Sequence, residues 1–137
     1  MSQTSLSLAR LARATSVHVG FAFLCMGGWA LFANRAHGLG ALVPALAQGV
    51  MSGLITLVLK HSLEAIGRRI RGLGAYVLPP VISATTVAAL LITVHGLIGT
   101  PEIAATIAVP WSVSTLYAIV YAATLARSRR GMETNPG

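Results

Sequence analysis

The chain has 137 residues, of which 55% are hydrophobic and only 9% charged, and its mean hydropathy is +0.75. Soluble domains carry about 25% charged residues, so this composition excludes an ordinary water-exposed surface. A net charge of +7 would indicate nucleic-acid binding in a soluble protein, but in so apolar a chain membrane topology explains it better. We therefore expect the lipid bilayer, and not a nucleic acid, as the partner of this chain.

Long charge-free stretches separate the charged residues. They are residues 14–34, 36–59, 72–101 and 103–126, which is 21, 24, 30 and 24 residues. Each is long enough for a helix to cross a bilayer, which takes about 20 apolar residues. The sequence predicts an all-α membrane protein, a four-helix transmembrane bundle forming one domain over residues 14–126. The predicted spans are residues 14–34, 41–60, 79–98 and 103–126, at approximate bounds.

The basic residues predict the orientation of this bundle. Nine of the ten lie on one side if the two termini and the 60–72 connection share that side, and Arg35 lies alone on the other. The positive-inside rule then places both termini in the cytoplasm, with short outer loops. Arginine outnumbers lysine nine to one and alanine and glycine are abundant, which is typical of a GC-rich bacterial genome. We expect a bacterial cytoplasmic (inner) membrane.

The N-terminal part of the chain leaves one alternative open. Residues 1–13 are polar and basic, and we expect a cytoplasmic segment that frays or forms a short surface helix. The apolar run of residues 19–33 is short enough for a cleaved signal sequence. We favour a retained first span, because Trp29 would interrupt the cleavage site and suits the outer interface. Cys25, the single cysteine, cannot form an internal disulfide and is expected to be a small packing residue.

The second span carries two ridges of residues at four-residue intervals. A ridge of small side chains is formed by Ala45, Gly49 and Gly53. A neighbouring polar ridge, offset from the first by one position along the helix, is formed by Gln48, Ser52 and Thr56. Small side chains let another helix approach closely, so we expect this span at the centre of the bundle, with the small-residue ridge as a helix-packing surface.

Helical spacing of apolar residues continues beyond the second span, through Leu63, Ile66, Ile70 and Leu73. The basic residues there lie mainly elsewhere around the helix, which predicts an interfacial amphipathic helix after span two. The candidate lipid-headgroup contacts are Lys60, Arg68, Arg69 and Arg71. The alternative, which we prefer, is that these charges only set the topology, because every inside loop carries such charges.

Glycines and prolines divide the second half of the chain. Gly72 and Gly74 are expected to end the preceding helix, and Pro79-Pro80 to begin the third span. Pro110 predicts a kink in the fourth span. Residues 127–137 are predicted to be a polar cytoplasmic tail that does not fold.

Polar residues within the spans suggest a transporter or pore as an alternative function. The candidate polar path is lined by Gln48, Ser52, Thr56, Thr86 and Ser114. Serine and threonine hydroxyls more often bond their own helix or a neighbouring one, whereas the amide of Gln48 is harder to satisfy locally. No charged side chain is predicted near the middle of any span, whereas proton-coupled transport generally needs one there.

The remaining groups give little support for catalysis. There is no aspartate, and the three glutamates are dispersed. His37, His95 and Glu102 on the outer side are candidates for a metal or pH-sensing site, but interfacial histidines that reach water are the favoured interpretation. We expect no metal and no cofactor. The sequence predicts a non-enzymatic homo-oligomer or subunit of a larger membrane complex that acts through helix–helix association.

Overall fold

The computed structural model describes residues 3–134, and the side chains of residues 15–131. Within this range its regular structure is entirely helical: α1 (Gln3–Ala33), the 3-10 helix η1 (Arg35–Ala41), α2 (Leu42–Arg69), α3 (Gly74–Leu97) and α4 (Ile103–Thr134). Four helices are long and apolar enough to cross a membrane. The prediction of an all-α chain with four potential spans is therefore confirmed.

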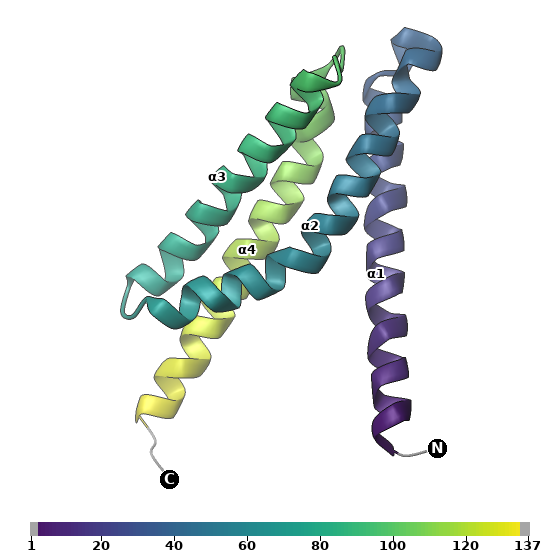
Figure 1. Cartoon of the computed structure of the whole chain (residues 1–137). Coiled ribbons are helices and arrows are strands. Elements are labelled where there is room, and N and C mark those ends of the chain that lie inside the picture. Colours follow the sequence, from purple (N-terminus) through teal and green to yellow (C-terminus); the bar gives the residue numbers. More distant parts are fainter. Residues whose placement is uncertain (1–2, 135–137) are drawn as a thin grey trace.

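The helices alternate in direction and form two hairpins, α1–α2 and α3–α4 (Figure 1). The η1 turn and the α3–α4 turn lie at one end, while both termini and the α2–α3 connection lie toward the other (Figure 1). We call the first the turn end and the second the basic end. Helix α2 contacts all three other helices, and so does α4. These contacts therefore do not single out α2 as the centre of the bundle, which stays a prediction from its two ridges.

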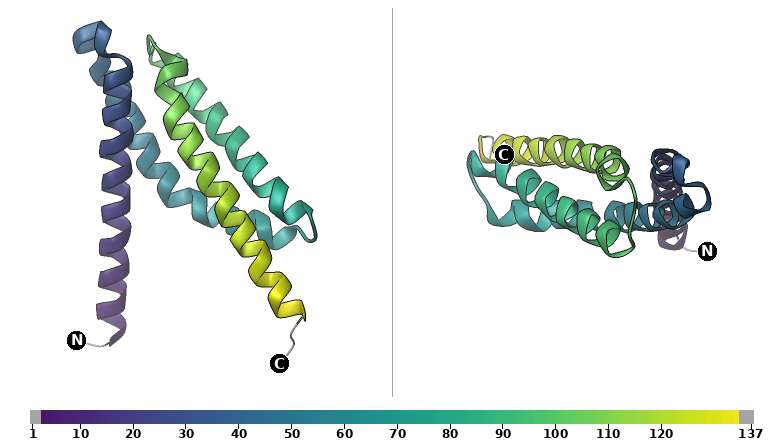
Figure 2. Two further views of the ribbon diagram at one scale, coloured as in Figure 1. Left: turned by 180° about the vertical axis from the view of Figure 1, so that it is seen from behind. Right: turned by 90° about the horizontal axis from the view of Figure 1, so that it is seen from above.

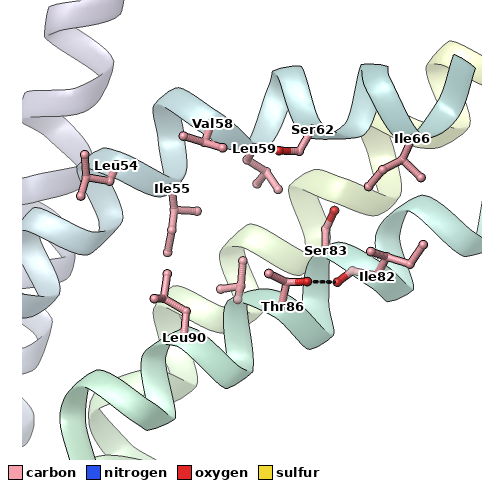
Figure 3. Close-up of a pocket in the computed structure, with 11 residues that line it drawn as sticks. Leu54, Ile55, Val58, Leu59, Ser62, Ile66, Ile82, Ser83, Thr86 and Leu90 are labelled. Atoms are coloured by element: carbon pink, nitrogen blue, oxygen red, sulfur yellow. Dashed lines mark hydrogen bonds between the residues drawn. The ribbon is translucent and has the colours of Figure 1, made fainter. Parts of the chain in front are cut away.

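Helix α2 is strongly bent. Its first half runs beside α1, and its second half turns away toward the start of α3 in both side views (Figures 1 and 2). The change of direction lies near Leu54 to Val58 (Figure 3). It follows a Ser52-Gly53 pair, and the Thr56 hydroxyl donates a hydrogen bond to the Ser52 carbonyl at 2.8 Å. Serine–glycine pairs and hydroxyls that bond the preceding turn are known causes of helix bending.

Several helix bounds differ from the predicted ones. Helix α3 begins at Gly74, so Pro79 and Pro80 lie inside it and not at its start. The reversal takes place at Gly72, whose φ of +67° suits glycine, and backbone bonds from Ala75 and Tyr76 to Gly72 and Leu73 then begin the helix. Once the helix has begun at Gly74, no further glycine lies between it and the prolines.

Helix α4 continues to Thr134, so the prediction of an unfolded tail from residue 127 is wrong for residues 127–134. The physical reason is a tertiary contact, because the Arg129 guanidinium donates a hydrogen bond to the Gly67 carbonyl near the end of α2. Helix α1 likewise extends back to Gln3 without a break at the predicted start of the span. Residues 135–137 lie outside the described residues.

The core is thin. One cluster joins Met51 to Val87 and Leu91, and another joins Leu59 and Leu63 to Ala118. Many large apolar side chains on all four helices are exposed instead, as expected for a surface that faces lipid. Because lipid removes the hydrophobic drive for helix association, close packing and hydrogen bonds must hold the helices together.

Candidate functional site

The first buried polar cluster is centred on His95 at the turn end of α3. Gln48 and His95 are both fully buried. The His95 Nε2 atom lies 2.9 Å from Gln48 Oε1, and its Nδ1 atom lies 2.7 Å from the Thr100 hydroxyl. Because an amide oxygen only accepts, we assign the ring proton to Nε2, and Nδ1 then accepts from Thr100. The Gln48 amide nitrogen donates to the Ser52 hydroxyl at 2.9 Å.

The second buried polar cluster is centred on Asn34, directly after α1. Its side-chain nitrogen donates to the Ala30 carbonyl at 2.9 Å and to the Thr106 hydroxyl at 2.7 Å. Its side-chain oxygen accepts from the Glu102 backbone N–H at 3.1 Å. The Thr106 hydroxyl in turn donates to the Glu102 carbonyl at 2.6 Å. Asn34 thus provides an acceptor for a backbone N–H just before α4 and joins the start of α4 to the end of α1.

Together the two clusters tie the hairpins to each other at the turn end. The His95 cluster joins α2 to α3, and the Asn34 cluster joins α1 to α4. The Trp29 indole adds a hydrogen bond to the Ala105 carbonyl at 2.9 Å. The sequence singled out Gln48 but missed Asn34 and Thr106, which are 72 positions apart. An asparagine directly after an apolar span was the only signal available.

The residues of the candidate polar path form hydrogen bonds with different partners. The hydroxyls of Thr56, Thr86 and Ser114 donate to carbonyls of their own helices, at Ser52, Ile82 and Trp111. Only Gln48 makes a side-chain bond to another helix among these candidates, through His95. The five residues therefore share no hydrogen-bond network beyond the Gln48–Ser52–Thr56 segment of α2.

The small-residue ridge of Ala45, Gly49 and Gly53 packs against α1 of the same chain. A Cβ atom at Gly49 would lie 2.9 Å from the Phe23 ring and 3.0 Å from the Phe23 carbonyl. A Cβ at Gly27 of α1 would lie 3.0 Å from the Ala45 carbonyl, and one at Gly53 would lie 3.2 Å from Val19. This ridge is occupied inside the chain, so it is not open to a second one.

The candidate metal residues separate in the structure. His37 and Glu102 form an exposed pair with 3.4 Å between Nε2 and Oε1, whereas His95 points into the first buried cluster. Across the described residues, no group of three or more histidine, cysteine, aspartate or glutamate side chains is placed to hold a metal ion. The geometry therefore gives the three candidates different surroundings and no common ligand site.

The candidate headgroup contacts lie on the second half of α2 and just after it. Lys60, Arg68, Arg69 and Arg71 are all exposed. Lys60 lies 3.9 Å from the Glu64 carboxylate, which accepts a 2.6 Å hydrogen bond from the Tyr121 hydroxyl of α4. The link between Glu64 and Tyr121 was not predicted, because 57 residues separate them.

Comparison with protein-family models, curated proteins and solved structures finds no match for this chain. Its description therefore depends on its own residues. The four apolar helices are compatible with a small integral membrane protein that crosses the bilayer more than once.

Proposed function

We propose that this protein is a non-enzymatic membrane protein that acts through helix–helix association, as a homo-oligomer or as a subunit of a larger membrane assembly. One observation carries the proposal, namely the outward face of α1. Gly20, Leu24 and Gly28 follow one another at four-residue intervals on this face, and nothing lies within 4 Å of a Cβ built at either glycine. All three residues are exposed within the single chain.

Glycine on that face favours a helical neighbour over lipid. A helix surface that meets only acyl chains gains nothing from glycine, whereas glycines at such spacing let two backbones approach closely. The other small-residue surface, on α2, is already covered by α1. The face of Gly20 and Gly28 is thus the small-residue surface of the α1–α2 hairpin that remains open.

The bend of α2 extends the open surface. Because α2 turns away, the half of α1 nearer the N-terminus stands apart from the other helices in both side views (Figures 1 and 2). Val17 lies in this half, and Phe21 and Leu24 follow it in the stretch of α1 whose other side packs on α2. Their exposed fractions are 64%, 68% and 71%. They share one side of α1 at intervals of four and three residues, which is the spacing at which two helices interlock.

The single cysteine provides a direct test of association. Cys25 is exposed on α1, beside the proposed surface. In membranes treated with a mild oxidant, we expect a Cys25–Cys25 disulfide dimer for a homo-oligomer, and none for Cys25→Ser. Gly28→Leu should reduce the dimer several-fold by keeping the backbones apart. Gly96→Leu is the matched control, since Gly96 is also exposed with nothing within 4 Å of its Cβ position.

A subunit of a larger assembly gives a different result in the same preparation. Native mass spectrometry of the detergent-solubilised protein would then show a second chain, and Gly28→Leu would release it. A protein that stays monomeric, without any partner chain, contradicts the proposal. Equal effects of Gly28→Leu and Gly96→Leu would contradict the choice of surface.

A transporter or pore is the alternative. It is supported by the buried amide of Gln48, but that amide already bonds Ser52 and His95, and three other candidate path hydroxyls bond their own helices. The Gln48 amide thus joins α2 to α3, and the three hydroxyls already use their single donor hydrogens within their own helices. Helix association is therefore the better-supported function.

A further inference from the structure

A groove of about 310 Å³ lies between the second half of α2 and the middle of α3 (Figure 3). Its lining is mainly aliphatic, with side chains such as Leu54, Val58 and Leu90, and it includes the hydroxyl residues Ser62, Ser83 and Thr86. All lining residues come from these two helices, and several are exposed, so the groove opens sideways from the molecule. In a membrane, this opening would face the hydrocarbon chains.

One buried hydroxyl in this groove lacks a hydrogen-bond partner. Ser83 is only 6% exposed, and its Oγ atom is buried without any hydrogen bond. Its side chain points from α3 into the groove toward α2 (Figure 3). The nearby Thr86 hydroxyl differs, because it donates to the Ile82 carbonyl at 2.8 Å. An unpaired hydroxyl in an apolar setting costs free energy, which an acceptor on a bound molecule would recover.

A cationic recess continues the groove toward the basic end. A second recess is lined by Ala65, Ile66, Arg69 and Ile70, and Ile66 belongs to both. Arg69 is exposed. Glu64 and Glu102, the acidic residues with described side chains, lie beside Lys60 and His37, and neither forms an ion pair with Arg69. Its guanidinium suits bidentate binding of a phosphate.

We propose that the two recesses together bind one anionic phospholipid. The order of groups along α2 and α3 matches the order within such a lipid. An acyl chain occupies the aliphatic groove, an ester carbonyl accepts the hydrogen bond of Ser83, and the phosphate meets Arg69. A free phosphate would leave the apolar groove and Ser83 unused, and a hydrocarbon would leave Arg69 and Ser83 unused. Only a molecule with all three groups in this order uses the whole site.

This inference goes beyond helix association and does not depend on it. The groove is formed by α2 and α3, whereas the proposed association surface lies on α1. Blocking the groove should therefore leave the Cys25–Cys25 disulfide unchanged, and Gly28→Leu should leave lipid binding unchanged. Failure of one proposal is distinguishable from failure of the other.

The test is native mass spectrometry of the full chain in detergent with added phosphatidylglycerol or phosphatidylcholine. We expect one tightly held phosphatidylglycerol per chain and weaker retention of phosphatidylcholine, although both have a phosphate, because only the first carries net negative charge. Arg69→Gln should weaken phosphatidylglycerol binding by about fivefold to tenfold, the scale of one basic residue at a membrane surface. Arg71→Gln is the matched control, since Arg71 is exposed but outside both recesses.

Two further variants test the groove and its hydroxyl. Val58→Trp fills the groove and should abolish the tightly bound lipid, whereas Leu57→Trp, one position away and outside the lining, should not. Ser83→Ala should reduce the rise in unfolding temperature that phosphatidylglycerol produces, without lowering the temperature of the lipid-free protein. The proposal is overturned if no lipid is retained, if the controls lose lipid equally, or if a protein chain occupies the groove instead.

Discussion

Gln48 shows how a polar side chain within a potential membrane span can join two helices. Its amide oxygen accepts from His95 of α3 and its amide nitrogen donates to Ser52 of α2. A buried amide with no partner would cost free energy, so the residue is tolerated only because His95 reaches it. The sequence identified Gln48 as the polar residue that its own helix could not easily satisfy. It did not identify His95 as the partner, because the two are 47 positions apart.

Gln48→Leu should destabilise the fold by about 1–3 kcal/mol, because it leaves the buried Nε2–H of His95 without an acceptor. The measurement is unfolding in mixed micelles titrated with a denaturing detergent. Thr86→Val is the control, since its exposed hydroxyl bonds only the Ile82 carbonyl of the same helix, and we expect a change within about 0.5 kcal/mol.

A double-mutant cycle with His95→Phe adds a second criterion. If Gln48 acts through His95, the two losses will not add. Additive losses, or equal losses from Gln48→Leu and Thr86→Val, would contradict the structural role assigned to this pair.

At the scale of the element, the α1–α2 hairpin depends on glycine where the two backbones meet. The periodicity of Ala45, Gly49 and Gly53 predicted a close helix contact but could not identify the partner. In the structure the partner is α1, through Val19, Phe23 and Gly27. A short turn makes α1 the nearest antiparallel neighbour of α2, so the ridge is covered before any second chain can reach it.

Gly49→Leu should destabilise the chain by about 1–3 kcal/mol, the usual cost of overpacking a close contact. Its first added atom would already lie 3.0 Å from the Phe23 carbonyl, which is backbone and cannot rotate away. The same detergent titration measures this loss, with Gly96→Leu as the matched control at an open glycine. Equal stability of the two variants would contradict the α1–α2 contact described above.

Other features of the elements were decided by contacts that no local pattern contains. Arg129 of α4 bonds α2 and so holds the extension of α4 beyond residue 127. The Tyr121 hydroxyl of α4 also bonds α2, through Glu64. Helix propensity alone gave no reason for a polar tail to continue. The helical spacing after span two, in contrast, correctly indicated that α2 continues past Lys60, but the helix ends at Arg69, before Ile70 and Leu73 of the predicted pattern.

At the scale of the whole molecule, the alternation of four helices places the two termini toward the same end (Figure 1). Which end faces the cytoplasm is predicted from charge. The connection from residue 60 to 72 and the two terminal segments hold nine of the ten basic residues, and the positive-inside rule assigns this end to the cytoplasm.

Cysteine labelling of intact bacterial cells tests this orientation. In a Cys25→Ser background, Ala36→Cys in η1 should react with a membrane-impermeant maleimide. Arg68→Cys near the end of α2, outside both recesses, should react only after the cells are permeabilised. Both positions are exposed in the structure, so accessibility to the reagent and not burial controls the result. The reverse pattern would invert the proposed topology.

The sequence by itself determined the number of potential spans, the helical class and the uneven distribution of charge, because these follow from apolar length and composition along the chain. The tertiary structure decided which polar groups meet, which small-residue surface stays open, and where α2 bends away to leave a groove. Hydrogen bonds such as Asn34–Thr106 join residues far apart in the chain. Their formation depends on how the helices are placed in space, which no local pattern of residues contains.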